Sequence, residues 1–303
     1  MERLFVGLQY ILPQHLISRL VGALTRVRWK PFKRAFIGWF SRHYGIDLGE
    51  AEISDPEAFS DFNEFFTRSL KAGTRPMPVD PDDMACPVDG VVSQAGPVQA
   101  GTLLQSKGHH YDLDGLLGGG VEGLKAGAVF ATLYLAPSNY HRIHMPVAGR
   151  LTSMRYEPGR LFSVNDATAR RVPGLFTRNE RVACIFETDQ GPLALVLVGA
   201  LNVGNIETVW AGQVAPKRWS ETQVTDYPSA GESAVRLERG DEMGRFNMGS
   251  TVIVVAPDSW SLAEHLAPGH PVRVGQILAR PAPDQPRPSA VSPAQASPAS
   301  AAR

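Results

Sequence analysis

The sequence is poor in cysteine, carries no net charge and has no long apolar run, and each absence excludes a class of protein. Its 303 residues include two cysteines, Cys86 and Cys184, which form no spacing pattern and favour a reducing compartment over a disulfide scaffold. Thirty basic side chains balance thirty acidic ones, so the net charge gives no reason to expect nucleic acid as a partner. No uncharged stretch reaches the roughly 20 apolar residues of a membrane-spanning helix. No small-residue cleavage site follows the first apolar stretch, so we expect no signal peptide.

Several common catalytic motifs are also missing. The chain has no Walker loop, no G-x-G-x-x-G ahead of a helix and no G-x-S-x-G nucleophile elbow. A zinc site would have to be built from histidines, but there is no HExxH motif and the two cysteines are far apart. We therefore expect no metal site. The histidines considered for it are His109, His110, His141 and His144.

The first 45 residues are basic and apolar at the same time. They hold eight basic side chains and one acidic side chain, interleaved with leucine, phenylalanine and tryptophan. We expect amphipathic helices here, interrupted near Pro13 and Pro31. Such helices suit a membrane interface, where anionic lipid attracts each basic residue by about 1 kcal/mol. Residues 1–59 are thus predicted to place the protein peripherally on the cytoplasmic face of the cell membrane; the alternative is a helical cap packed on the protein's own core.

The remainder predicts an α+β fold with a β-rich core. Residues 61–70 should form a short helix, capped by Ser60 or Asp61. From residue 84, short β-branched runs separated by glycine and proline indicate strands. The runs are VDGVVSQAG, AVFATLYLAP, PVAGRLTSM, RVACIFET, PLALVLVGALNV, IETVWAG, STVIVVAP and GQILA. We place the core at residues 60–280 and a disordered Pro/Ala-rich tail at residues 281–303.

The sequence Gly249-Ser250-Thr251 is suited to self-cleavage. Gly249 has no Cβ, so its carbonyl can be approached closely. The Ser250 hydroxyl could attack that carbonyl and convert the amide to an ester. β-Elimination would then cut the chain, and loss of ammonia would leave an N-terminal pyruvoyl group. The simpler interpretation is a turn ahead of a strand.

Two further segments could supply the groups that activate such a serine. The segment PSNYHRIHMP carries His141 and His144 after an expected strand, and CPVDGVV carries Asp89. Asp-Gly alone is a common hairpin turn. Together, however, Asp89, His144 and Ser250 provide a carboxylate, an imidazole base and a hydroxyl, and such sets occur in any chain order.

Taken with their surroundings, these motifs resemble phosphatidylserine decarboxylases of the prokaryotic membrane type. The similarity covers nearly all of residues 60–257. It rests on the segments FFTRSLKAGTRP, CPVDGVVSQAG, SKGHHYDLDGLLG, YHRIHMPVAG, PGRLFSVN, PGLFTRNERV, VGALNVGNIETVWAG and EMGRFNMGSTVIV.

The resemblance implies a pyruvoyl-dependent lyase of phospholipid biosynthesis, made as a zymogen. It would convert phosphatidylserine to phosphatidylethanolamine and CO₂. The cut between Gly249 and Ser250 would give a β chain of residues 1–249 and an α chain of residues 250–303. By motif, Asp89, His144 and Ser250 drive the cut, and the substrate amine forms a Schiff base with the pyruvoyl group derived from Ser250. His141 would return a proton to the α-carbon.

Two positions depart from the family pattern, and three interpretations stay open. Asn139 stands where many relatives have Asp, and Met248 replaces a more usual Leu. PVAGRL and VGQILA resemble hairpins of biotin- and lipoyl-carrier folds, but no lysine lies at a suitable tip. A peripheral membrane protein that no longer cuts itself is a further alternative. The sequence leaves open whether the protein forms a homodimer.

The loop SKGHHYDLDGLLG is expected to be a mobile lid near the lipid headgroup. Its apolar residues are Leu113, Leu116 and Leu117.

Overall fold

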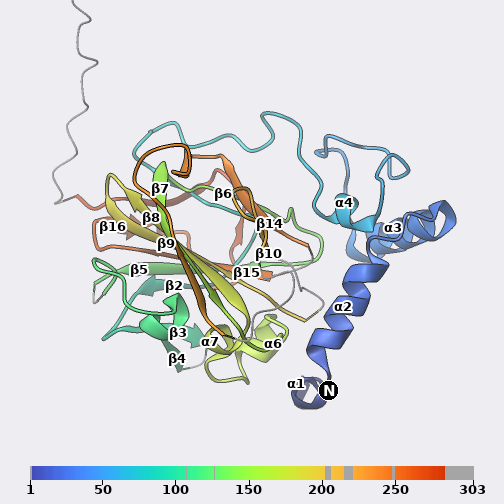
Figure 1. Ribbon diagram of the computed structural model, residues 1–303, viewed down its shortest axis with the longest axis horizontal. Coiled ribbons are helices and arrows are strands. Elements are labelled where there is room, and N and C mark those ends of the chain that lie inside the picture. Colours follow the sequence, from blue (N-terminus) through green and yellow to red (C-terminus); the bar gives the residue numbers. More distant parts are fainter. Residues whose placement is uncertain are drawn as a thin grey trace, which may run out of the picture.

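The computed structural model describes residues 2–106, 108–125, 127–201, 206–214, 221–247 and 250–283. Within these residues three long helices come first, a short helix packs beside the third, and three more short helices lie among the strands. They are α1 (Glu2–Ile11), α2 (Gln14–Leu24), α3 (Lys30–Tyr44), α4 (Phe62–Phe66), α5 (Leu113–Leu117), α6 (Asp166–Ala169) and α7 (Leu175–Arg178). Figure 1 shows α1, α2 and α3 along one side of the strands. No helix in the described part of the chain is long and apolar enough to cross a membrane.

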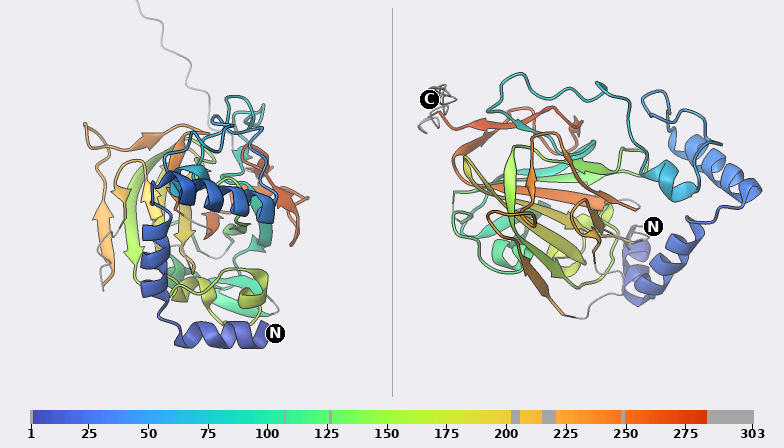
Figure 2. Two further views of the ribbon diagram at one scale, coloured as in Figure 1. Left: turned by 90° about the vertical axis from the view of Figure 1, so that its right-hand side faces the viewer. Right: turned by 45° about the horizontal axis from the view of Figure 1, so that its top comes forward.

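Helices α1 and α2 expose most of their apolar side chains and bury polar ones, the reverse of an ordinary surface helix, whereas α3 buries Ile37 and Phe40 in an apolar cluster. Leu4 and Ile11 are each 78% exposed, whereas Gln9 is 1% exposed. Gln9 Oε1 accepts a hydrogen bond from Ser163 N at 2.7 Å, which ties α1 to the core. Further exposed apolar residues on the three helices are Phe5, Leu8, Leu16, Leu20, Leu24, Trp29 and Trp39. Figure 2 shows the three helices folded back and forth beside the core.

The strands described here pair antiparallel. The largest sheet has the order β12-β7-β8-β9-β15-β5-β2-β17, with β13 beside β7. Smaller sheets have the orders β11-β10-β14-β6, β1-β18-β16 and β3-β4. The bounds are β1 (Met84–Ala85), β2 (Gly90–Pro97), β3 (Thr102–Ser106), β4 (His109–Asp112), β5 (Val129–Leu135), β6 (Arg142–His144), β7 (Gly149–Glu157), β8 (Arg181–Thr188), β9 (Gly191–Val198), β10 (Ile206–Thr208), β11 (Gly212–Gln213), β12 (Gln223–Asp226), β13 (Arg236–Leu237), β14 (Glu242–Phe246), β15 (Ser250–Ala256), β16 (Trp260–Leu262), β17 (Pro271–Val272) and β18 (Ile277–Pro281).

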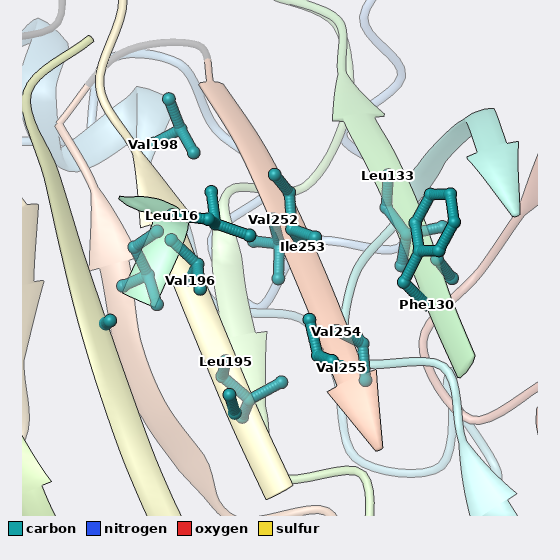
Figure 3. Packing of buried hydrophobic residues seen from close by; sticks show 14 of the residues in the cluster. Leu116, Phe130, Leu133, Leu195, Val196, Val198, Val252, Ile253, Val254 and Val255 are labelled. Carbon is teal, nitrogen blue, oxygen red and sulfur yellow. The ribbon is translucent and has the colours of Figure 1, made fainter. Parts of the chain in front are cut away.

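Strand β15 forms the centre of the core. All seven of its residues are buried, and it pairs with β5 on one side and β9 on the other. Its run of β-branched residues is continuous rather than alternating because both faces of the strand are covered. Figure 3 shows its valines and Ile253 packed among side chains of β5, β9 and α5. Ser250, the first residue of β15, is therefore fixed at one end of the most enclosed strand.

The predicted α+β fold is confirmed, with N-terminal helices followed by a core of antiparallel sheets. Asp61 caps α4, since its Oδ1 accepts from Glu64 N at 2.9 Å. The expected tail begins inside β18, which extends to Pro281, and residues 284–303 lie outside the described residues.

The hypothesis of an apolar lid is wrong. Leu113, Leu116 and Leu117 belong to α5 and are buried in the main core. Their apolar faces are covered by the sheet and by α7, so they stabilise the fold instead of facing a lipid headgroup.

Candidate active site

Ser250 presents an unpartnered hydroxyl inside the protein. The residue is completely buried, and its Cα lies opposite Leu135 of β5. Its Oγ, and Oγ1 of the neighbouring Thr251, have no hydrogen-bond partner among the described residues. A buried hydroxyl without a partner costs about 1–3 kcal/mol, so this position is unfavourable for stability alone. Gly249, on the other side of the predicted cut, lies outside the described residues, as does Met248.

Backbone hydrogen bonds bring Asp89 and His144 into one region. His144 ends β6, and its N–H donates to Pro87 O at 2.9 Å, two residues before Asp89. Asp89 leads into Gly90, where a Cβ would collide with Tyr134 O of β5. The Asp-Gly pair thus permits close approach of β2 to β5 and does not form a hairpin turn.

The side chains of Asp89 and His144 bond to other groups. Arg75 Nε lies 3.0 Å from Asp89 Oδ1, and Arg75 Nη2 lies 2.6 Å from Oδ2. The other donor to Asp89 is Val274 N, at 2.9 Å from Oδ1. His144 Nδ1 lies 2.7 Å from Gly240 O, and its Nε2 lies 2.9 Å from the Tyr140 hydroxyl. The predicted role of Asp89 in fixing the imidazole tautomer is therefore filled by the Gly240 carbonyl in this structure.

These bonds define the protonation of His144. A carbonyl oxygen only accepts, so Nδ1 carries the proton and Nε2 accepts from Tyr140. Burial lowers the pKa of His144, opposed by the hydrogen bond to Gly240 and by the charges of Glu242 and Asp89. Neutral His144 is thus a base with its lone pair on Nε2, and Asp89 acts on it through charge rather than direct contact.

His141 has the second unpartnered atom of the site. The residue is completely buried, and its Nδ1 donates to Asn139 O at 2.8 Å. Its Nε2 has no partner among the described residues. Burial lowers the pKa of His141 to about 3, so the ring is neutral near pH 7 and Nε2 is a bare acceptor. Asn139 Oδ1 accepts from Ala136 N at 2.7 Å, a bond that a carboxylate oxygen could also accept, and this bond shapes the turn that holds His141.

The chain returns to this region just before Ser250. Phe246, the last residue of β14, donates its N–H to His141 O at 3.1 Å. Asn247 follows, and its Oδ1 accepts from Asn63 Nδ2 of α4 at 3.0 Å. His141 and the approach to Ser250 are thereby held on adjoining elements.

Sequence reasoning missed the residues that surround the four predicted ones. Arg75 and Tyr140 hold Asp89 and His144, and Phe66 of α4 covers His141 with ring centres 4.1 Å apart. Arg68 donates from Nη2 to Ser138 O at 3.3 Å. Both arginines lie in FFTRSLKAGTRP, so the motif itself was the available signal. Its ion-pair partners could not be inferred, because they depend on the tertiary fold.

Comparison with known proteins gives one consistent result. The family model described as phosphatidylserine decarboxylase matches residues 62–280, and a second, described as PSD, matches residues 4–45. The phosphatidylserine decarboxylase proenzyme of Pseudomonas aeruginosa is 51% identical over 284 residues, covering 92% of this chain and 98% of the relative. The proenzymes of Pseudomonas fluorescens and Shewanella baltica are each 52% identical, over 91% and 92% of this chain and 97% of each relative.

Proposed function

This chain belongs to the phosphatidylserine decarboxylase family, and we propose that its self-cleavage falls between Gly249 and Ser250 with His144 as the base. It is a lyase that decarboxylates phosphatidylserine in phospholipid biosynthesis, and it is made as a proenzyme. The single observation that supports this assignment of the site is the buried, unpartnered hydroxyl of Ser250, which begins β15 opposite Leu135, a few residues before the segment that carries His141 and His144.

Self-cleavage requires that Ser250 lose its proton as it attacks the preceding carbonyl. His144 Nε2 holds a lone pair and can take that proton. Tyr140 occupies this nitrogen at 2.9 Å, so Ser250 must replace the Tyr140 hydroxyl there for the transfer to occur. The carboxylate of Asp89, held by Arg75, stabilises the imidazolium that results.

The surroundings of Ser250 fit a covalent pyruvoyl group. The ketone beside an amide carbonyl supplies an electron sink for the pair released as CO₂ leaves. The Ser250 hydroxyl, whose oxygen leaves in the β-elimination that precedes the ketone, is completely buried and unbonded, so its loss breaks no hydrogen bond of the described residues. The enclosed end of β15 also excludes water from the reacting carbon.

His141 is our candidate for the proton transfers of turnover. The substrate arrives as an ammonium, and its amine must lose a proton to react. His141 Nε2, bare and buried, can accept that proton and later return it to the α-carbon. The low pKa of His141 opposes the first of these transfers and favours the return step.

We further propose that α1–α3 hold the enzyme on the membrane that contains its substrate. The apolar residues on their outer surface, including Trp29 and Trp39, suit the interfacial region of a bilayer. A groove of about 690 Å³ along α3 is lined by Glu57 and by four basic side chains, Lys30, Lys33, Arg34 and Arg42. Arg34 pairs with Glu57 and Lys33 is bonded to backbone carbonyls, which leaves Lys30 and Arg42 suited to anionic headgroups.

Intact mass spectrometry under denaturing conditions tests the assignment of the site. Wild-type protein should give fragments 1–249 and 250–303, the smaller with a ketone in place of its amine. Ser250→Ala should stay a single, inactive chain, while Ser261→Ala, at an exposed serine of β16, should be cut normally. A Ser250→Ala protein that runs as two chains would disprove the proposal.

A further inference from the structure

Arg68 is a buried cation that lies over the Phe65 ring, 5.8 Å from its centre, and forms no ion pair among the described residues. The residue follows α4 and is 6% exposed. Of its five N–H donors, the protein engages only one on Nη2, with Ser138 O at 3.3 Å. Its Nε and Nη1 are buried and have no partner among the described residues. Leaving a charged donor group unsatisfied in the interior is costly, so a purely structural role is disfavoured.

Among the described residues, the buried Arg181 and the partly buried Arg75 have their donors engaged, unlike Arg68. Arg181 donates to the carbonyls of Leu116 and Thr177, both at 2.8 Å, and to those of Gly115 and Asn179. Arg75 bonds both oxygens of Asp89 and a carboxylate oxygen of Glu50. Asp89 is therefore already neutralised by Arg75, and no carboxylate of the described residues forms an ion pair with Arg68.

The unpaired guanidinium adjoins the candidate active site. Ser138, its one partner, lies in the turn after β5, three residues beyond Leu135, which is paired with Ser250. Phe66, two residues before Arg68, stacks on His141. The charge of Arg68 adds to the burial that lowers the pKa of His141, so the two groups interact. Arg68 thus lies on the His141 side of the site, with two buried nitrogens that bond no group of the described residues.

Phosphatidylserine offers two anions to such a group, a carboxylate and a phosphodiester. The carboxylate loses its charge as CO₂ leaves. A cation bonded to it would therefore stabilise the ground state more than the transition state and slow the reaction. The phosphodiester keeps its charge throughout, so a cation there binds substrate without opposing the chemistry. Its oxygens also match the planar donor array of a guanidinium.

We propose that Arg68 binds the phosphodiester of the substrate through Nε and Nη1, and so holds the serine headgroup at the end of β15. This inference rests on the assignment of Ser250 as the reacting position. Arg68 is then a substrate-binding residue that serves substrate and product alike, because both contain the same phosphodiester.

The test compares Arg68→Gln and Arg68→Lys with wild-type protein on short-chain phosphatidylserine. Intact mass must first show that each variant is cut and carries the ketone, so that a defect in processing is not taken for a defect in binding. We expect KM of Arg68→Gln to rise at least tenfold, with kcat within about threefold of wild type, since a charged hydrogen bond contributes about 1.5–3 kcal/mol. KM of Arg68→Lys should fall between the values of wild type and Arg68→Gln. Arg236→Gln, at an exposed arginine of β13, is the matched control and should leave both constants unchanged.

Inhibition by short-chain phosphatidylethanolamine decides which anion is bound, because this product has the phosphodiester but no carboxylate. We expect its inhibition constant to rise by the same factor as KM in Arg68→Gln. An unchanged inhibition constant with a raised KM would assign Arg68 to the carboxylate and overturn the proposal. If KM and the inhibition constant of Arg68→Gln both equal those of wild type, the proposal is also overturned. If both variants stay uncut while wild type is cut, Arg68 serves folding or cleavage and the proposal is wrong; an uncut, active wild type would instead disprove the assignment of Ser250.

Discussion

The buried glutamines of the N-terminal helices and the polar groups at the end of β15 are bonded differently, although the buried Ser18 Oγ of α2 also has no partner among the described residues. In α1 and α2, the amides of Gln9 and Gln14 are bonded to the core, with Gln14 Oε1 accepting from Leu161 N at 2.8 Å. At the end of β15, His141 Nε2 and Ser250 Oγ have no partner among the described residues. A satisfied buried polar group attaches one element to another, whereas an unsatisfied one remains available for chemistry.

The outer surfaces of the two regions differ as well. The helices turn apolar side chains outward, while the strands of the core bury theirs. The helices therefore offer two different surfaces. Polar side chains bond to the protein core, and apolar side chains are suited to contact lipid. The following changes test this division, from the largest expected effect to the smallest.

Removing the two imidazoles should separate cleavage from turnover. His144→Ala should remain one uncut chain, because Ser250 loses its base. His141→Ala should be cut but turn over about 10²–10⁴-fold more slowly, since general acid–base catalysis contributes factors of that size. Denaturing gels and assays on short-chain substrate measure the two effects. The opposite pattern would mean that the roles of the two histidines are exchanged.

Making the outer surface of α1 polar should release the protein from lipid. Leu4→Gln combined with Ile11→Gln should weaken binding to anionic vesicles at least tenfold, because burying a leucine or isoleucine side chain contributes about 1.5–3 kcal/mol. Activity on a soluble short-chain substrate should stay unchanged. Val79→Gln, at a fully exposed valine outside the helices, is the control. Equal losses in binding and activity would favour a structural cap over a membrane anchor.

Removing a bonded amide should loosen only the attachment of α2 to the core. Gln14→Leu deprives Leu161 N–H of its acceptor, at a cost of about 1–3 kcal/mol. Hydrogen exchange at the Leu161 amide should then be about tenfold faster or more. Gln99→Leu, at an exposed glutamine, should leave that rate as it is. An unchanged rate in Gln14→Leu would show that the hydrogen bond does not protect this segment.

The pH dependence of stability should reflect the buried neutral imidazole of His141. The pKa of His141 is about 3 in the folded protein and about 6.5 for an exposed histidine, so the unfolded chain binds more protons between these values. The contribution of His141 is therefore complete above about pH 6.5 and is lost as the pH falls toward 3. The melting temperature of His141→Gln should fall less steeply than that of wild type in this window. Parallel curves would contradict the low pKa.

The sequence predicted the helices and strands well, but it did not predict which side chains bond to one another. Proline positions and charge predicted α1–α3, and β-branched runs predicted β5, β8, β9 and β15, because local composition determines these. The leucines of α5 were misassigned, since an apolar run among glycines is compatible with a lid or a core.

Side-chain partners depend on contacts between distant segments. His144 bonds a carbonyl 96 positions away, and Asp89 accepts from an amide 185 positions away. No spacing rule relates such pairs. The sequence was therefore enough to propose Asp89, His144 and Ser250 as a catalytic set, but it could not predict the groups that bond to Asp89 and His144. The unbonded state of Arg68 is equally invisible without the fold.

The position of β15 has a consequence for the life of each molecule. Beyond Ser250 the chain runs between β5 and β9, then adds β17 to β2 and β18 to β1. A cut ahead of Ser250 therefore yields two polypeptides whose strands pair in the same sheets. They cannot separate unless those sheets unfold. The smaller polypeptide is not an exchangeable subunit. Each molecule makes its reactive group once, and a copy whose ketone is consumed in a side reaction can be replaced only by new synthesis.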